Sequence, residues 1–346
     1  MQLPSLTDLL DRAHVVTCPL RVPFRGVTER EIMLVDAPDG WVEWSPFLEY
    51  GPVEASRWLR SAVLLGWGGL PTPPVTSVAV NATVPAVTDL SLVPMLLDRY
   101  PGCTTVKVKV AERGQTLAED VARVRAVREA APGIAVRVDA NAGWSVDEAF
   151  AAAVALTDPA QGGGPLDYME QPCATVAELA ELRRRMGSRG MMVRVAADEL
   201  IRKASDPMAV VQAGACDVAV VKAAPLGGVD HVRAIASSVG QYGVAVTVSS
   251  ALESAVGMYA GLYAAATLPG YTDDEDLVVE PQAAGLATGA LYAEEVCAPR
   301  EIVAGRLAVE RCVPEDARLE ALASAPDRRD WWFDRLAASY AELAGA

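Results

Sequence analysis

Histidine and closely spaced cysteines are scarce in this sequence. The 346 residues include only two histidines, His14 and His231, and six cysteines that stand far apart without a CxxC pair. A zinc site or a disulfide framework needs such residues at short, regular spacing. We therefore expect neither in this protein.

Long apolar runs and clusters of basic residues are also missing. No stretch approaches ~18 uninterrupted apolar residues, and the first residues lack the basic and apolar regions of a signal peptide. The formal charge is −15 and the pI is about 4.7, with lysine and arginine scattered along the chain. Binding to a phosphate backbone needs clustered basic side chains. We therefore expect a cytoplasmic protein that binds neither nucleic acid nor a membrane.

Apolar residues, in contrast, are numerous enough for a large core. They make up 51% of the chain, which predicts one large domain or two unequal ones. The proline-rich segment LPTPPVTS marks a boundary. Residues 1–76 contain short turn-rich strands and a helix, which predicts a small α+β domain. Residues 77–304 form the second domain, and we expect the final segment, 305–346, to return to the first.

Short Val- and Ala-rich runs alternate with amphipathic helices in the second domain. Capping boxes mark two helix starts, where Ser145 is followed by Glu148 and Thr175 by Glu178. Eight alternating strands predict a (β/α)8-type barrel. The competing architecture is a doubly wound sheet, but the sequence has no GxGxxG motif after the first strand. The expected strands are residues 77–84, 104–110, 135–141, 166–172, 192–199, 216–223, 244–250 and 276–281.

Two lysines share one face of the strand TTVKVKV. Alternate residues of a barrel strand point toward the barrel axis, so Lys107 and Lys109 should point inward while the valines between them face the helices. Each of the next four strands ends in a polar residue of the same inward parity, namely Asp139, Glu170, Asp198 and Lys222. The sequence therefore predicts a cluster of charged side chains at the mouth of the barrel.

Three carboxylates gathered at that mouth need a counter-charge. Burying them together without one would raise their pKa values and cost several kcal/mol, so the cluster calls for a cation. Oxygen ligands with no histidine or cysteine nearby indicate Mg²⁺, with Mn²⁺ as a possible substitute.

The ordered motifs KVK (107–109), VDAN (138–141), MEQP (169–172), ADE (197–199) and KAAPLGG (222–228) resemble the enolase superfamily, in the branch of the muconate lactonizing enzymes. The resemblance covers essentially the whole chain. It implies a TIM-type (β/α)7β barrel with an α+β capping domain formed by the N-terminal segment and the C-terminal tail.

By this resemblance, Mg²⁺ would be bound by Asp139, Glu170 and Asp198, with Asn141 and Glu199 in supporting positions. Lys107 would orient and polarise, and Lys109 and Lys222 would face each other across a small-molecule carboxylate substrate. Abstraction of a proton α to a carboxylate creates a second negative charge, which a divalent metal and an ammonium group can stabilise. A lysine base at neutral pH also needs a lowered pKa, which a neighbouring cation such as Lys107 can provide.

Three details resemble dehydratases of this branch, which aromatise a cyclohexadiene carboxylate. They are RVPFRG at 21–26, SSALESAVG at 249–257 and KAAPLGG at 222–228. This resemblance implies that Lys109 removes the α-proton and then assists departure of hydroxide, while Lys222 stabilises the intermediate. Backbone N–H groups at Ser249 and Ser250 would bind a substrate carboxylate. Arg25 and the 45–51 loop would close the site.

Two alternatives stay open. A racemase of N-acylamino acids or a dipeptide epimerase would use Lys109 and Lys222 as bases on opposite faces, and the acidic run 273–276 could then bind a substrate amino group. A non-catalytic metabolite-binding barrel is a hypothesis of a different class, favoured by loss of a ligand or a lysine, and none is missing. No obligate protein partner is implied.

Overall fold

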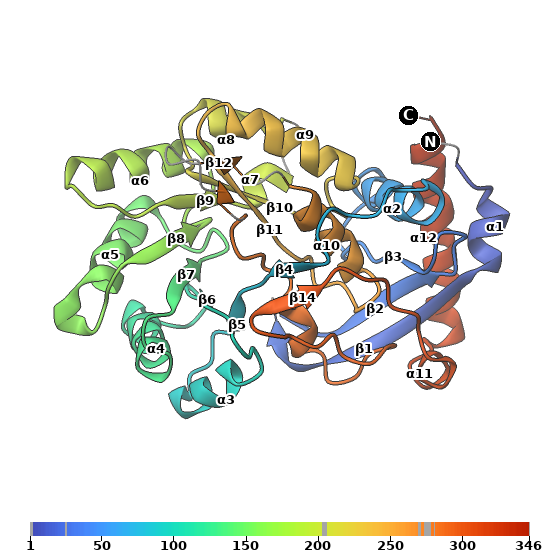
Figure 1. Cartoon of the computed structure of the whole chain (residues 1–346), viewed down its shortest axis with the longest axis horizontal. Coiled ribbons are helices and arrows are strands. Elements are labelled where there is room, and N and C mark those ends of the chain that lie inside the picture. Colours follow the sequence, from blue (N-terminus) through green and yellow to red (C-terminus); the bar gives the residue numbers. More distant parts are fainter. Residues whose placement is uncertain are drawn as a thin grey trace.

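The computed structural model describes residues 3–24, 26–202, 206–268, 271–272, 278–279 and 281–345. Its first part is a three-stranded antiparallel sheet with helices on its flank (Figure 1). The elements of this part are α1 (Leu6–Asp11), β1 (Ala13–Phe24), β2 (Val27–Val35), β3 (Val42–Trp44) and α2 (Pro52–Trp67).

The C-terminal segment packs against this first part. It contains β14 (Arg306–Ala308), α11 (Asp316–Ala321) and α12 (Pro326–Gly345). The indole rings of Trp44 on β3 and Trp332 on α12 meet edge to face, with centroids 5.4 Å apart, and neither residue is exposed. This is a favoured arrangement for aromatic pairs. The two ends of the chain therefore share one apolar core.

Seven parallel strands form the second part, in the order β11-β10-β9-β8-β7-β6-β5. They are β5 (Ala82–Val84), β6 (Thr105–Lys109), β7 (Ala135–Asp139), β8 (Leu166–Glu170), β9 (Val195–Ala197), β10 (Val218–Val221) and β11 (Ala245–Val248). The accompanying helices are α3 (Val93–Leu97), α4 (Leu117–Ala130), α5 (Val146–Thr157), α6 (Val176–Ser188), α7 (Glu199–Arg202), α8 (Ala209–Gln212), α9 (Val229–Gly240) and α10 (Met258–Thr267). The helices surround a curled sheet (Figure 1).

Register between the strands aligns the charged residues at their carboxyl ends. The Cα atoms of Lys109 and Asp139 are partners between β6 and β7, and those of Asp139 and Glu170 are partners between β7 and β8. Val106 and Val108, which alternate with the lysines, have no exposed surface and lie in the main core. The predicted inward parity of Lys107 and Lys109 is confirmed.

The prediction for the first and last strands of the barrel needs correction. The run 77–84 is divided, because β4 (Ser77–Ala79) pairs antiparallel with β14 and only β5 joins the parallel sheet. In the predicted strand 276–281, β13 (Val278–Val279) pairs instead with β12 (Tyr271–Thr272), and residues 276, 277 and 280 lie outside the described ones.

Residues 284–285 stand where the last strand was expected. Parallel bridges join Ala284 to Val80 and Gly285 to Ser249, so this short segment contacts both edges of the curled sheet. A Cβ atom at Gly285 would lie 2.8 Å from the Ser249 hydroxyl, which explains glycine at this close approach. Ala and Gly have low strand propensity, and the sequence therefore gave no sign of this pairing.

The predicted helix starts are confirmed. Ser145 and Thr175 each accept the N–H of the glutamate three residues later, whose side chain binds back to the cap. Within the part of the chain that the structure describes, no helix has the length and apolar character needed to cross a membrane.

Candidate active site

Six charged side chains meet at the carboxyl ends of the parallel strands, and all are nearly inaccessible to solvent. Their exposed fractions are 9% for Lys107, 7% for Lys109, 1% for Asp139, 1% for Glu170, 0% for Asp198 and 2% for Lys222. The structure thus brings together all of the lysines and acids that the sequence predicted there. Groups buried this deeply must be paired.

The lysines and carboxylates form pairs across neighbouring strands. The Lys109 ammonium donates to Asp139 Oδ2 at 2.5 Å, and Lys222 donates to Asp198 Oδ2 at 2.6 Å. Lys107 lies between two acids, 3.1 Å from both Glu170 carboxylate oxygens and 3.4 Å from Asp139 Oδ2. Three cations therefore balance three anions.

Burial and like charges perturb this cluster. Desolvation raises the pKa of Glu170 to about 7, and the neighbouring Asp139 carboxylate adds to the rise. Burial works against the charged form of Lys107, but Glu170 and Asp139 outweigh it and hold the pKa of this lysine above its ordinary value. Lys107 is thus a fixed cation, suited to orientation and charge stabilisation.

The donor set fits Mg²⁺. Asp139, Glu170 and Asp198 offer only carboxylate oxygens, which hard divalent cations prefer. As they stand, the Lys107 ammonium lies between Asp139 and Glu170, and no three metal-binding side chains among the described residues converge on one point. Asp139 and Asp198 both add to the raised pKa of Glu170, so the three carboxylates repel one another here.

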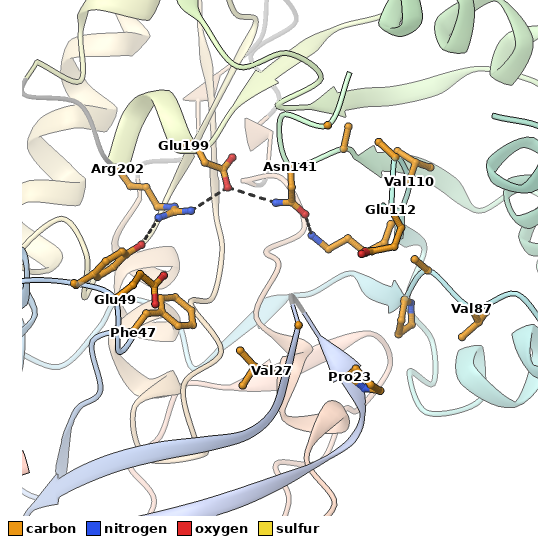
Figure 2. Close-up of a pocket in the computed structure, with 18 residues that line it drawn as sticks. Pro23, Val27, Phe47, Glu49, Val87, Val110, Glu112, Asn141, Glu199 and Arg202 are labelled. Atoms are coloured by element: carbon orange, nitrogen blue, oxygen red, sulfur yellow. Dashed lines mark hydrogen bonds and ion pairs between the residues drawn. The ribbon is translucent and has the colours of Figure 1, made fainter. Parts of the chain in front are cut away.

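A chain of hydrogen bonds leads away from Lys109 (Figure 2). Lys109 donates to Asn141 Oδ1 at 2.5 Å, and the Asn141 amide donates to Glu199 Oε1 at 3.4 Å. Arg202 donates to the same Glu199 oxygen at 2.9 Å and to the Tyr50 hydroxyl at 2.8 Å. Asn141 and Glu199 therefore lie beside the charged cluster, and the chain of hydrogen bonds reaches the N-terminal part through Tyr50.

Arg202 joins this network of charged groups, and no motif in the sequence pointed to it. Its Nε also lies 3.2 Å from Asp198 Oδ1, and the residue is only 7% exposed. The spacing in the sequence could have indicated these contacts, because acids three and four residues before an arginine lie on the same face of a helix as the arginine. Lysine usage was another missed signal, since the chain has only four lysines and three of them lie in this cluster.

A cavity of about 910 Å³ opens beside these groups. Lys109 at the end of β6, Asn141 in the loop after β7, and Glu199 and Arg202 on α7 line one side of it. Pro23, Val27, Phe47, Glu49 and Tyr50 line it from the N-terminal part (Figure 2). The 45–51 loop therefore lies where the sequence analysis expected a cover, whereas Arg25 falls outside the described residues.

Ser249 and Ser250 line a small adjoining cavity with Lys107, Lys109 and Lys222. Their backbone N–H groups already donate to the carbonyls of Val221 and Gly285, at 2.8 and 3.0 Å. In this conformation the serines face the lysines without N–H groups to offer a substrate. The Ser250 hydroxyl is also engaged, since it shares a hydrogen bond with Thr288 at 2.7 Å and accepts the N–H of Leu252 at 2.8 Å.

Left-handed backbone recurs at the strand ends around the site. Ala111 follows β6 with φ of 58°, Asn141 follows β7 with 45°, Gln171 follows β8 with 39° and Leu252 follows β11 with 62°. Side-chain-bearing residues rarely adopt such values, which tend to cluster at functional sites. The backbone geometry marks the same end of the sheet as the charged cluster.

Two models of known protein families match the chain. Residues 96–313 match the family model described as "Enolase C-terminal domain-like", and residues 15–64 match "Enolase N-terminal domain-like". With its lysines and carboxylates at the strand ends, the chain belongs to the enolase superfamily. Its predicted membership of this superfamily is confirmed.

Two relatives define the family more closely. The chain is 56% identical to an o-succinylbenzoate synthase of Mycobacterium marinum over 97% of its own length and 95% of that protein. It is 52% identical to one of Mycolicibacterium smegmatis, covering 98% of each chain. Within the superfamily, it belongs to the family of o-succinylbenzoate synthases.

Solved structures share the fold at low sequence identity. The muconate lactonizing enzyme of Pseudomonas fluorescens superimposes with a TM-score of 0.70 at 19% identity, covering 90% of this chain and 98% of that one. The N-succinyl Arg/Lys racemase of Bacillus cereus gives 0.69 at 15% identity, covering 91% and 97%. These likenesses concern the fold alone.

Proposed function

We propose that the protein carries out the reaction of its family, as a Mg²⁺-dependent carbon–oxygen lyase. It would convert 2-succinyl-6-hydroxy-2,4-cyclohexadiene-1-carboxylate into o-succinylbenzoate by syn elimination of water through an ene-diolate, a step of menaquinone synthesis. The observation that carries this proposal is the pairing of Lys109 and Lys222 with buried carboxylates beside a cavity large enough for a small ligand.

Lys109 is the proposed base. As a neutral amine it takes the proton from the carbon that bears the carboxylate. The resulting ammonium then gives a proton to the hydroxyl group on the neighbouring carbon, so that water leaves and the ring becomes aromatic. Its hydrogen bonds to Asp139 and Asn141 hold Nζ at a fixed point at the cavity wall. One group on one face can serve both proton transfers.

Lys222 and Lys107 are proposed to remain cations. Lys222 would stabilise the negative charge that develops on the substrate carboxylate, and Lys107 would hold Glu170 and Asp139 in place. Mg²⁺, bound by Asp139, Glu170 and Asp198, would supply further electrostatic stabilisation of that charge.

We also propose that the curled sheet is a (β/α)7β barrel, completed by residues 284–285, with a capping domain. The cap would comprise residues 1–76 and the returning segment 305–346, and the barrel residues 77–304. The pairing of Ala284 and Gly285 with both sheet edges and the burial of Trp44 against Trp332 support this division. Arg25, Ser249 and Ser250 remain proposed substrate contacts.

The test offers the purified protein the cyclohexadiene substrate and, in parallel, N-succinylamino acids in D₂O, both with Mg²⁺. We expect EDTA-sensitive loss of the diene absorbance. Lys109→Ala should reduce it by about 10²–10⁴-fold. Arg125→Met, which removes an exposed cation on α4, is the control. Deuterium entering an acylamino acid without turnover of the diene would move the function to the racemase, which needs the same two lysines.

A further inference from the structure

A second cavity is separate from the main cavity and takes no part in the proposed reaction. Its volume is about 540 Å³, within the range of small-ligand sites. It is bounded by the short helix η3 (Ala287–Leu291), residues 293–302 and the segment around Arg99. No residue that lines it belongs to the charged cluster or to the main cavity.

The floor of this second cavity is apolar. Five large side chains from four separate segments form it, and each is at most 9% exposed. They are Met258, Leu286, Ile302, Leu307 and Leu322. Such a floor favours the apolar body of a ligand, because covering apolar surface removes it from water.

The walls carry an unusual concentration of positive charge for a protein of formal charge −15. Four arginines line the cavity, namely Arg21, Arg99, Arg300 and Arg318. Arg300 and Arg318 bind backbone carbonyl groups, and Arg318 also forms an ion pair with Glu315 at 3.0 Å. Neither guanidinium group of Arg21 and Arg99 makes a hydrogen bond or ion pair with any residue that the structure describes.

The acids in the same walls offset this charge only in part. Glu294 and Glu301 are exposed at the edge, whereas Glu295 is 6% exposed. Burial raises the pKa of Glu295 to about 8, so near neutral pH this carboxyl group is mostly uncharged. The cavity therefore presents guanidinium groups over an apolar floor.

We propose that this second cavity binds a small amphipathic carboxylate. Its apolar body would lie on the floor, and its carboxylate would receive hydrogen bonds from Arg21 and Arg99, whose planar groups match a carboxylate in two-point contact. Inorganic phosphate has the negative charge but no apolar group to cover the floor of the cavity. A neutral analogue of the ligand has the apolar body but no negative charge for Arg21 and Arg99 to bind.

The occupant would lie against the back of the catalytic site. In η3, Thr288 faces the small cavity with the lysines, whereas Ala287, Gly289 and Ala290 line the second cavity. Glu295 accepts a hydrogen bond from the N–H of Ala255 at 2.8 Å. Arg300 donates a hydrogen bond to the carbonyl oxygen of Ala255, also at 2.8 Å. The second cavity thus shares η3 and the 249–257 loop with the active site.

Calorimetry with 4-phenylbutyrate, and with 4-phenylbutyramide as its neutral counterpart, tests the proposal. Both titrations contain EDTA, so that binding at a metal site does not contribute. We expect the carboxylate to bind at least about 10-fold more tightly than the amide, as a charge-assisted hydrogen bond predicts. Arg21→Met and Arg99→Met should each lose a similar factor. Arg57→Met, an exposed arginine on α2, should change nothing.

Three outcomes would overturn the proposal. Equal affinity for the carboxylate and the amide would show that the arginines take no part. Equal competition by inorganic phosphate would show a plain anion site. Loss of binding in Lys222→Met, with binding kept in Arg99→Met, would place the ligand in the catalytic pocket instead. Failure of the dehydratase assay would leave this test unaffected, because it needs neither Mg²⁺ nor turnover.

Discussion

Replacing Glu295 with glutamine isolates the effect of one buried carboxyl group on stability. Its Oε2 accepts the N–H of Ala255, and its Oε1 is buried without a partner among the described residues. Burial is the main cause of its raised pKa, and the Glu43 carboxylate adds to it, while Arg300 acts in the opposite direction. Glutamine keeps an acceptor for Ala255 and cannot ionise.

The sign of the effect follows from the two pKa values, 4.5 ordinarily and about 8 in the folded protein. Between them, the unfolded chain releases the proton and the folded chain keeps it, so stability falls as pH rises. The decrease in unfolding free energy is complete once the pH exceeds the pKa of Glu295 in the folded protein. From pH 5 to pH 8 this group should cost roughly 3.5 kcal/mol of unfolding free energy.

Urea unfolding of both proteins across this pH range provides the measurement. The difference in unfolding free energy, Glu295→Gln minus wild type, should rise with pH by up to about 1.4 kcal/mol per unit. Taking the difference cancels the other titrating groups. Glu294→Gln, at an exposed neighbour, controls for loss of one negative charge. A difference that stays flat across the range would refute the raised pKa of Glu295.

Four further changes have definite expected outcomes. Arg202→Met should lower kcat by about 10²-fold with little change in KM, because the acids it binds lose their orientation, and Arg202→Lys should restore little; steady-state kinetics would contradict this if only KM changed. EDTA should abolish turnover and added Mg²⁺ restore it, and turnover that resists EDTA would exclude the proposed metal chemistry. Thr175→Ala should cost about 1 kcal/mol of unfolding free energy through loss of its cap, with kcat unchanged; an unaltered urea midpoint would contradict this. Gly285→Ala should lower the melting temperature, since its Cβ would lie 2.8 Å from the Ser249 hydroxyl, and an unchanged melting temperature would show that the strands can separate there.

Sequence periodicity was a reliable guide where strands have strong side-chain signals. Lys107 and Lys109 alternate with valines, and the acids stand at the ends of Val-rich runs, so parity alone placed them on one face. The prediction failed where pairing depends on small residues. Ala284 and Gly285 contact both sheet edges through backbone groups, for which no side-chain pattern exists.

Contacts between segments far apart in the chain could not be predicted from the sequence either. Arg202 binds Tyr50, which lies 152 positions earlier in the chain, and this contact could not be read from local spacing. The second cavity gathers arginines whose positions range from 21 to 318, and only folding reveals their shared wall. Local signals predicted the catalytic cluster, whereas the surroundings of that cluster required coordinates.

The left-handed residues at the strand ends have a consequence for resistance to heat. Ala111, Gln171 and Leu252 each hold a backbone conformation that costs of order 1 kcal/mol or more for a residue with a side chain. Glycine at Ala111 would relieve that cost in the native state, while giving the loop after β6 new freedom to move. Selection for thermal tolerance alone would therefore favour such replacements and loosen the frame that holds Lys109. The same few backbone angles therefore affect both the positioning of Lys109 and the thermal stability of the protein.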